Sequence, residues 1–578
     1  MPAIKMPPVD VAERRPPGNI VRPSVVLLAL LGLLAALVLT PVPATAQATT
    51  VLVTTSLDNN DVDEDCTEGS DVCTLREAVN VAETGDTITF DVGVDPQLSE
   101  TLGQILIAEK AVTIVGNLDG SGPGTTIAGN EDGDDPYEDR LFGITDASSL
   151  TMSNVTLTGG SRDGATNEAR QGGAISNQGT LDLTNVTLEG NEAHTGGGIA
   201  NRGGNAIAVI RESTFRDNNA GVFGGAISNQ DGTVELIDSR LEDNTANVGG
   251  AIQTNAITDD AQLTVRRSTV TGNTANNISG GIDVQSNSLE GGGPTSNALV
   301  IDSTISNNTA PLGGGLSSWL SAEAILTIER STVAGNTATG EGVGSRGGGG
   351  LYIDAGTARV RNSTFSGNTA AEGGAVFSSG ARSQLELVHV TIVENTAPDG
   401  GGVFQQGDFF ATFFGDQIGS GSTTLTHSIV ADNEGGDCAF SESSDPDIVE
   451  LGSLGHNLDS DGSCNQLDSD VTAADVMLGD LADNGGQTLT HLPLEGSPAI
   501  EGGLNPTCLL DVDQRGEPRP GANSGACDIG AVEIQVADEP VEPVEPIEPV
   551  EPIAVDPPIE LPMSGPAEPV EAQPDYAG

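Results

Sequence analysis

The chain has few basic residues, and this scarcity limits the partners it can bind. Lys and Arg together number 22 against 83 Asp and Glu, so the formal net charge is −61, and Lys110 is the last lysine. Nucleic acid and anionic membrane surfaces attract proteins through clusters of Lys and Arg. We therefore expect no nucleic-acid partner, and membrane contact only through an uncleaved leader or a C-terminal anchor.

Aromatic residues are also scarce, at 3% of the chain with a single Trp, whereas Gly occurs 77 times. The repeated part lacks runs of about 10 to 15 residues with the 3.6-residue periodicity of helices. These two absences exclude a thick aromatic core and a helical repeat architecture. The motif G-x-x-x-x-G-K-[ST] and the spacing C-x-x-C are also absent, which argues against a phosphate-binding loop and a zinc site.

A repeat organises the rest of the sequence. Glu212–Asn229 reads ESTFRDNNAGVFGGAISN, and Asn362–Ser378 reads NSTFSGNTAAEGGAVFS. Each copy holds a Ser-Thr step, then an Asn, then a Gly pair and an aliphatic residue. The Asn recurs at intervals of 26 to 38 residues, at Asn191, Asn218, Asn244, Asn273, Asn308, Asn336, Asn368, Asn395 and Asn433. Such a period indicates a repeat architecture.

The pattern within a repeat predicts short strands. Alternations of apolar and polar residues end at Asn and Gly, which tolerate the left-handed conformations that corners require. Three strands and three corners make one coil of a right-handed parallel β-helix, and about ten to twelve coils stack at the ~4.8 Å inter-strand spacing. We therefore predict an all-β solenoid over residues 91–435, in which each coil is stable only against its neighbours. The recurring Asn predicts a structural ladder of stacked amides at one corner rather than a ligand site.

The first 90 residues predict an export signal followed by a cap. Residues 1–46 combine basic residues, the apolar run Ser24–Thr40 and the small-residue site Ala44–Ala46, as a cleaved secretory signal peptide does; an uncleaved membrane anchor is the alternative. In residues 47–90, a Thr74–Glu77 capping box starts a short helix with one apolar face. We expect this helix to cover the open end of the first coil.

Several motifs resemble known secreted proteins. Cys73–Val79 reads CTLREAV and resembles the CSLREA segment of secreted bacterial β-helix proteins with the pectin-lyase-like fold, with Thr74 where Ser is usual. The F-x-x-N and GGA[ILV] strings, as in Phe215–Asn218 with Gly224–Ile227, resemble the repeats of polymorphic outer-membrane proteins. Those proteins are surface-exposed and adhesive, so the resemblance implies an adhesin-like role.

Residues 436–536 change character, because the repeat stops. LADNGGQTLTHLPL at Leu481–Leu494, GSPAI at Gly496–Ile500, DQRG at Asp513–Gly516 and CDIGAVE at Cys527–Glu533 resemble the choice-of-anchor Q region of such proteins. The resemblance implies a C-terminal cap that finishes the solenoid. Arg515 and Arg519, together with Asp513, Asp528 and Glu533, fit ion pairs that lock the cap better than a catalytic cluster.

Residues 537–578 predict a disordered tail. A Val-Glu-Pro or Ile-Glu-Pro triplet repeats from Val541 to Pro552, a composition typical of an extended polyproline II spacer. Leu561–Gly565 (LPMSG) resembles a sortase signal, but it has Ser564 in place of Thr and lacks the hydrophobic segment expected after it.

Cysteines, aromatic residues and acidic residues supply the remaining candidates. Six Cys in an exported chain allow fifteen disulfide pairings, of which sequence proximity favours Cys66–Cys73, Cys438–Cys464 and Cys508–Cys527. Four Phe gather in the insert Gly407–Ser422, at Phe409, Phe410, Phe413 and Phe414. Together with Trp319, they either pack on the flank of the solenoid or form an exposed patch that binds sugar.

Calcium is the only cofactor that the sequence suggests. Asp61, Asp63 and Asp65 begin like an EF-hand loop, but Cys66 and Val72 occupy the positions of its Gly and its final Glu. A solvated acidic loop without a bound ion is the favoured interpretation, and no other cofactor is expected.

The sequence favours a bacterial protein that is secreted or held at the cell surface, with an adhesive or structural role. Its expected partners are surface glycans or host and cell-surface proteins. The alternative is a secreted polysaccharide lyase or glycoside hydrolase of the same fold. The sequence favours the absence of catalysis, because the polygalacturonase-like strings N-T-D and G-H-G and the string R-I-K are absent and the five His lie in unrelated contexts.

Overall fold

The computed structural model describes residues 48–58, 66, 72–99, 102–117, 124–129, 139–162, 171–287, 292–319, 323–340, 347–406, 421–441, 449–464, 467–504, 508–521 and 525–535. The expected signal peptide, the triplet Asp61, Asp63 and Asp65, the four clustered Phe and the tail lie outside these residues. Within the described residues, no helix has the length and apolar content needed to cross a bilayer.

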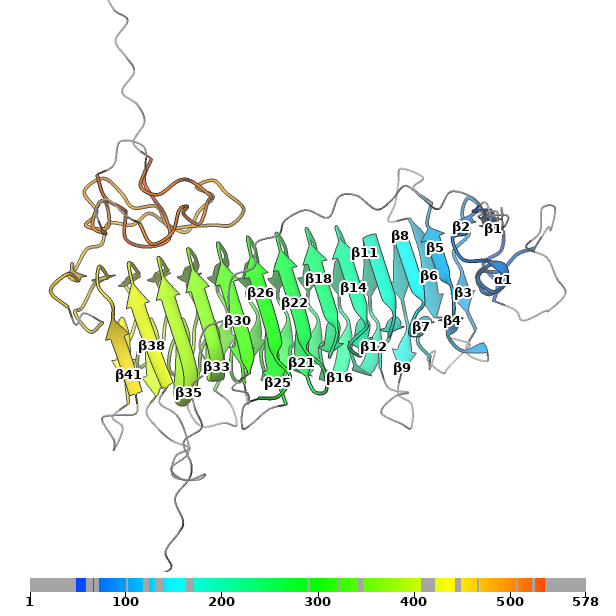
Figure 1. Cartoon of the computed structure of the whole chain (residues 1–578), viewed down its shortest axis with the longest axis horizontal. Coiled ribbons are helices and arrows are strands. Elements are labelled where there is room, and N and C mark those ends of the chain that lie inside the picture. Colours follow the sequence, from blue (N-terminus) through cyan, green and yellow to red (C-terminus); the bar gives the residue numbers. More distant parts are fainter. Residues whose placement is uncertain are drawn as a thin grey trace, which may run out of the picture. The chain divides into compact units, whose positions relative to one another are not determined.

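The chain forms an all-β parallel solenoid of about eleven coils (Figure 1). Each strand pairs in parallel with its counterpart one coil later, so the strands stack into four faces, which we number in chain order. Face 1 contains β4 (Ile105–Ile107), β7 (Phe142–Ile144), β10 (Ile175–Asn177), β13 (Ile199–Arg202), β17 (Ile227–Gln230), β21 (Ile252–Ala256), β25 (Ile282–Ser286), β29 (Leu316–Ser318), β37 (Val403–Gln406) and β40 (Cys438–Phe440).

Face 2 follows face 1 in each coil. It contains β1 (Thr50–Val53), β2 (Thr87–Phe90), β5 (Ala111–Val115), β8 (Ser149–Thr158), β11 (Thr180–Glu189), β14 (Ile207–Arg211), β18 (Thr233–Ile237), β22 (Ala261–Arg266), β26 (Ser296–Ile301), β30 (Ala324–Glu329), β38 (Gly421–Thr426) and β41 (Val449–Ser453). The long strands β33 (Leu351–Arg361) and β35 (Val376–Val388) pair along both faces 1 and 2.

Faces 3 and 4 complete each coil. Face 3 contains β3 (Gln97–Leu98), β6 (Thr125–Gly129), the ends of β8 and β11, β15 (Thr214–Arg216), β19 (Arg240–Glu242), β23 (Thr269–Thr271), β27 (Thr304–Ser306), β31 (Thr332–Ala334), β34 (Thr364–Ser366), β36 (Thr391–Val393), β39 (Ile429–Ala431), β42 (Leu458–Asp459) and β43 (Val471–Thr472). Face 4 contains β9 (Ser161–Arg162), β12 (Glu192–Thr195), β16 (Asn219–Phe223), β20 (Thr245–Val248), β24 (Thr274–Ile278), β28 (Thr309–Ala310) and β32 (Thr337–Ala338).

The number of strands per coil depends on the corner between faces 2 and 3. In β11 the two faces form one continuous strand, which leaves three strands in that coil, as expected from the sequence. In the five consecutive coils from β13 to β32, the strand of face 2 ends before that of face 3 begins, so each coil has four short strands. The corner residue has positive φ in both arrangements, at 48° in Asp238 between two strands and at 53° in Asn185 within the continuous β11.

Apolar side chains stack in rows inside the coils. One row on face 1 runs through Ile199, Ile227, Ile252 and Ile282, which pair in register and are fully buried. Rows of the same kind on faces 2 and 3 contribute to one continuous core cluster. Each coil buries its apolar residues only against the next coil, so neighbouring coils depend on each other for stability.

The helix α1 (Leu75–Val81) joins this core at its N-terminal end. The side chain of Thr74 accepts a hydrogen bond from the Glu77 amide, and the Glu77 carboxylate accepts one from the Thr74 amide, which completes the expected capping box. Leu75, Ala78 and Val79 are buried in the same cluster as the first strands. Arg76 forms a salt bridge of 2.7 Å with Asp58.

The C-terminal segment, which we define as residues 474–535, packs against the side of the solenoid. Strands up to β43 continue the stack, whereas Val476, Ala499 and Ile529 of this segment pack on Ile429 and other residues of face 3. Gly530 approaches so closely that an added Cβ would lie 2.6 Å from the Cδ1 atom of Ile429. The resemblance implied a cap that finishes the solenoid, and the structure places this part of it along the flank.

Candidate functional site: a polar row on face 1

The repeating Asn side chains form a continuous ladder inside the corner between faces 3 and 4. The Asn191 Nδ2 donates to the Asn218 Oδ1 at 2.9 Å, and the same bond of 2.9–3.0 Å repeats through every successive member to Asn433. Each ladder oxygen also accepts the backbone N–H of the preceding Asn, as Asn218 does from Asn191. These buried amides are therefore satisfied by one another and by the backbone, and they stabilise the corner.

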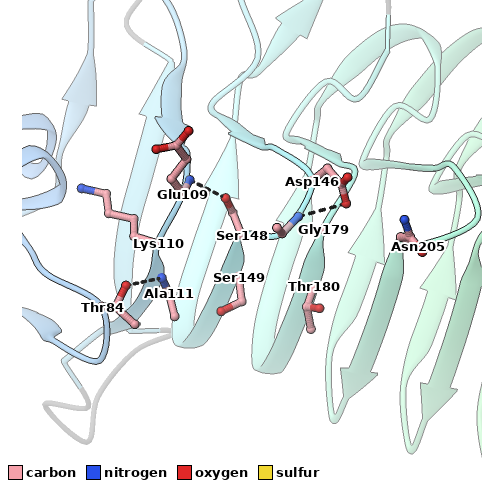
Figure 2. Close-up of a pocket in the computed structure, with 11 residues that line it drawn as sticks. Thr84, Glu109, Lys110, Ala111, Asp146, Ser148, Ser149, Gly179, Thr180 and Asn205 are labelled. Carbon is pink, nitrogen blue, oxygen red and sulfur yellow. Dashed lines mark hydrogen bonds between the residues drawn. The ribbon is translucent and has the colours of Figure 1, made fainter. Parts of the chain in front are cut away.

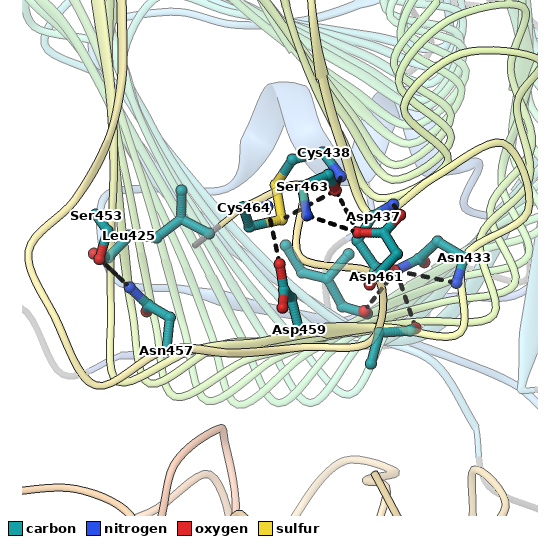
Figure 3. The surroundings of a disulfide bond; sticks show 12 residues. Leu425, Asn433, Asp437, Cys438, Ser453, Asn457, Asp459, Asp461, Ser463 and Cys464 are labelled. Carbon is teal, nitrogen blue, oxygen red and sulfur yellow. Dashed lines mark hydrogen bonds between the residues drawn. A yellow bond between two sulfur atoms is a disulfide. The ribbon is translucent and has the colours of Figure 1, made fainter. Parts of the chain in front are cut away.

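The ladder ends at a buried carboxylate beside a disulfide (Figure 3). The Asn433 Nδ2 donates to the Asp437 Oδ1 at 3.0 Å, and the Ser460 hydroxyl donates to the Asp437 Oδ2 at 2.6 Å. Cys438 and Cys464 are joined next to it, and the other two disulfides join Cys66 to Cys73 and Cys508 to Cys527. All three pairs are those that sequence proximity favoured.

The outward side chains of face 1 form the polar row that we regard as the candidate site. Arg202, Gln230, Asn255 and Gln285 occupy paired positions on β13, β17, β21 and β25, one per coil, and each is half-buried. Trp319 comes directly after Ser318, which pairs with Val284, so it is the next member of the row. The polar row thus aligns a guanidinium, three amides and the chain's single Trp along one line, with the Asn255 Oδ1 and Gln285 Nε2 atoms buried.

A cavity of about 450 Å³ lies at the N-terminal end of the polar row. Arg140, Gln171, Gln178 and Arg202 contribute to its lining, and the Arg202 Nη1 donates to the Gln171 Oε1 at 3.3 Å. This cavity gathers two of the chain's few basic residues with amide side chains. It can therefore offer several hydrogen-bond donors to a polar ligand.

A second cavity, of about 350 Å³, lies on the coils next to α1 (Figure 2). Its lining includes Lys110, whose Nζ donates to the carbonyl oxygen of Ala82 at 3.3 Å. The Glu109 amide donates to the Ser148 hydroxyl at 2.8 Å. These groups support the end of the helix and the local turns, so this cavity is a weaker candidate for ligand binding.

A buried acid, Asp283, lies beside the polar row, two residues before Gln285 on the same side of β25. The Ser317 Oγ donates to the Asp283 Oδ1 at 2.7 Å, and the Ser279 Oγ donates to the Ser317 Oγ at 2.6 Å. Asp283 Oδ2 has no hydrogen bond of normal geometry among the described residues, although the Gln285 side chain lies close enough to lower the pKa. Burial outweighs these effects and raises the pKa of Asp283 to about 7.

Ser279 is unusual for its place in the repeat. Its φ is 57°, whereas the equivalent residue in other coils is a Gly with positive φ, as at Gly172, Gly196, Gly224, Gly249, Gly313, Gly348, Gly373 and Gly400. A left-handed conformation costs a non-Gly residue on the order of 1 kcal/mol or more. The Ser279–Ser317–Asp283 group is therefore a local departure from the repeat, next to Gln285.

Aromatic rings continue face 1 towards the C-terminal coils. Tyr352, Phe377 and Phe404 stack with ring centroids 5.3 and 5.5 Å apart, and all three are buried. Trp319 packs against this cluster and stays half-buried. The sequence left two interpretations of Trp319, packing on the flank of the solenoid or exposure in a binding patch. Each holds in part, because one portion of the indole packs against the cluster and another is accessible to solvent.

The charged residues of the C-terminal segment form buried ion pairs. Arg519 contacts Glu533 at 2.9 Å with both side chains fully buried, and Arg515 contacts Asp513 at 2.8 Å. Asp528 accepts the backbone N–H of Ile534 at 2.6 Å, and burial raises its pKa to about 6. These contacts hold the segment itself together. In the described residues no group of three or more His, Cys, Asp or Glu is arranged to hold a metal ion.

Sequence reasoning missed the corner between faces 2 and 3. One residue per coil adopts positive φ there: Asn154, Asn185, Glu212, Asp238, Arg267, Asp302, Arg330, Asn362, His389, His427 and His456. Arg267 forms a salt bridge with Asp238, and Arg330 forms one with Asp302, each at 2.7 Å. Three of the five His thus share one corner, although their sequence contexts are unrelated.

Comparison with known proteins supports the repeat. Residues 362–379 match the model of the Chlamydia polymorphic membrane protein repeat, and no curated protein sequence shows significant similarity to the chain. The structure of the periplasmic alginate epimerase AlgG gives a TM-score of 0.31 at 11% identity over 66% of this chain and 83% of that one. The PL6 family alginate lyase AlyGC gives 0.26 at 12% identity over 76% and 55%.

Proposed function

We propose that the protein is exported, is located at the cell surface or secreted, and binds carbohydrate through the polar row on face 1. The match to a polymorphic membrane protein repeat and the three disulfides support an extracellular location. The single observation that carries the binding proposal is the alignment of Arg202, Gln230, Asn255, Gln285 and Trp319 in one line, one residue per coil.

The chemistry of the polar row suits an extended glycan. An amide side chain offers both donors and an acceptor, as each sugar hydroxyl requires. The row repeats at the spacing of parallel strands, about 4.8 Å, so one sugar ring of a chain can contact side chains from neighbouring coils. An indole offers a flat apolar face for the C–H side of a ring, and Trp319 stands at the end of the amides.

The test is binding of the purified protein to a panel of neutral and charged oligosaccharides. We expect Trp319→Ala to weaken binding by about tenfold, since an aromatic contact contributes roughly 1 kcal/mol or more. The double variant Gln230→Ala, Gln285→Ala should weaken it further. Thr264→Ala is the matched control, because Thr264 points outward from β22 on face 2.

Three outcomes count against the proposed role. Equal binding by Trp319→Ala and Thr264→Ala would remove the polar row as the site. Accumulation of the full-length protein in the cytoplasm after cell fractionation would remove the extracellular role. Release of new reducing ends or unsaturated products from the same panel would assign catalysis in place of simple adhesion.

A further inference from the structure

Three His rings stack under the C-terminal segment. His389, His427 and His456 occupy successive coils at the corner between faces 2 and 3, with ring centroids 4.9 and 5.0 Å apart. His389 and His427 are buried, and His456 is half-buried. Neither ring nitrogen of His389 has a hydrogen bond of normal geometry among the described residues.

The C-terminal segment docks directly on these residues. The Gly530 amide donates to the His427 carbonyl oxygen at 2.7 Å, and the Leu504 amide donates to the His427 Nε2 at 3.2 Å. The Ala531 amide donates to the Thr391 hydroxyl at 2.9 Å. Because the Nε2 of His427 accepts a hydrogen bond, the docked arrangement requires that nitrogen to be unprotonated.

Further bonds tie the segment to the preceding coils. Thr364 donates to the Gln514 Oε1 at 2.7 Å, and the Gln514 Nε2 donates to the Thr332 hydroxyl at 3.1 Å. The Asn362 Nδ2 donates to the Val512 carbonyl at 2.7 Å. None of these neutral bonds involves a group that titrates between pH 4 and 8, so they do not themselves respond to mild acid.

The charges described next to the His stack belong to the C-terminal segment. Arg519 lies close to the stack, and its guanidinium bonds the carbonyl oxygens of Asp528 and Gly530 as well as the Glu533 carboxylate. Asp513 and Asp528 of the segment also act on Arg519. Burial first, and then Arg519 and His427, hold the pKa of His389 well below 6.5. Burial, followed by His456 and Arg519, lowers the pKa of His427 to about 4.

We propose that the buried pair His389 and His427, stacked with His456, is an acid-sensitive latch that holds the C-terminal segment on the solenoid and releases it when the two buried rings take up protons. The docked state excludes protons from two buried rings, and the released state exposes them to water. The occupancy of the docked state therefore falls as the pH drops below the ordinary His pKa of about 6.5. Release uncovers the hydroxyl row Thr332, Thr364 and Thr391 on face 3.

The direction of the effect follows from proton counting. Each ring that binds a proton only after release changes the opening constant by up to tenfold per pH unit. Asp528 acts in the opposite direction, because its raised pKa lets the docked state hold a proton below about pH 6. We expect the two His to outweigh this single carboxyl, so the opening constant rises roughly tenfold or more between pH 6.5 and 5.0.

The test is amide hydrogen exchange of the full-length protein between pH 7 and 5, corrected for the intrinsic rate at each pH. The amides of Leu504, Gly530 and Ala531 bond to the coils and report docking directly. We expect their protection to fall with pH while the amides of the Asn ladder stay protected. Equal loss of protection in both regions would mean global acid unfolding and would overturn the proposal.

Variants distinguish proton-dependent release of the C-terminal segment from a weakening of its docking that does not depend on pH. His389→Phe keeps an aromatic ring that cannot be protonated, and we expect it to reduce the pH slope by up to tenfold per unit while the segment stays docked. His427→Gln should reduce the slope as well. His194→Gln, in β12 on face 4, is the control and should leave the slope unchanged. A wild-type slope in both latch variants would overturn the proposal even if the segment were looser.

Discussion

The regular coils and the C-terminal segment satisfy their buried polar groups in different ways. Both must satisfy buried polar groups, because an unpaired group costs about 1–3 kcal/mol. The coils do so with neutral amides that bond to their own copies in the next coil, as Asn191 does with Asn218. The segment has no copies, and it relies on charges such as Arg519 and Glu533, at 2.9 Å and without access to solvent.

Because of this difference, we expect the stability of the two regions to respond differently to pH and to the removal of a single side chain. A neutral ladder is insensitive to pH between 4 and 8, and its energy is shared by many equivalent bonds. A buried charge cluster depends on every member, because removing one leaves the others uncompensated. Four variants test this contrast, and we expect their effects on stability to decrease from Arg519→Met to Arg267→Met.

Arg519→Met should have the largest effect. It leaves Glu533 buried without its partner, and such a loss typically costs about 3–5 kcal/mol. We expect loss of protection confined to residues 474–535, measured by amide hydrogen exchange. Arg359→Met is the control, since Arg359 is about two-fifths exposed and contacts Glu386 at 3.8 Å. Equal effects of the two variants would contradict the contrast.

Asn218→Ala should rank second. It removes the acceptor of the Asn191 side chain and backbone and the donor to Asn244, so we expect a loss of about 3 kcal/mol in the free energy of unfolding. Urea denaturation measures it. Asn219→Ala is the neighbouring control, because Asn219 is exposed and its side chain donates to Glu192 at 3.2 Å, outside the ladder. If both variants behave alike, the ladder does not stabilise the coils.

Asp283→Asn should stabilise the protein, whereas the two preceding variants should destabilise it. A folded-state pKa of about 7, raised from 3.8, means that the folded state loses stability as pH rises from about 4 to 7, with no further loss above that. The Asn variant should therefore be more stable than wild type by about 2 kcal/mol or more at pH 8, and equal to it at pH 4. Urea titrations at the two pH values measure this difference. The same gain at both pH values would show that ionisation is not the cause.

Arg267→Met should have the smallest effect. Its bidentate pair with Asp238 stands at the corner between faces 2 and 3, with both side chains about two-fifths exposed. Exposed ion pairs contribute about 0–1 kcal/mol. We expect the smallest change of the four variants in urea denaturation, decreasing further in high salt. A loss as large as that of Arg519→Met would show that burial does not decide the strength of these pairs.

The repeat allowed much of the fold to be predicted. The Asn and Gly pattern at intervals of 26 to 38 residues predicted a parallel β-helix, and the structure confirms that fold. The Ser-Thr step has a physical meaning that the sequence did not reveal: Ser213, Ser239 and Ser268 form a second row of bonds from backbone N–H to hydroxyl, at 3.0 Å. The export signal, the calcium triplet and the tail remain predictions.

The candidate site was not predictable in the same way. Trp319 was ambiguous because its surroundings depend on which outward residues share its row, and Arg202, Gln230, Asn255 and Gln285 are chemically unlike one another. Coils of unequal length also hide the register, so His389, His427 and His456 showed no common spacing. Their alignment became visible only when each was placed at the same left-handed corner.

The sequence by itself determined the coil, because a strand period of two, left-handed corner residues and a repeated Asn act locally and in every copy. Only the tertiary structure shows which outward side chains of successive coils share a row. It also shows where the C-terminal segment, the last sixty or so residues before the tail, docks. Those contacts join residues about 150 positions apart, such as Thr364 with Gln514. No local pattern encodes them, since they depend on the summed lengths of all the coils between.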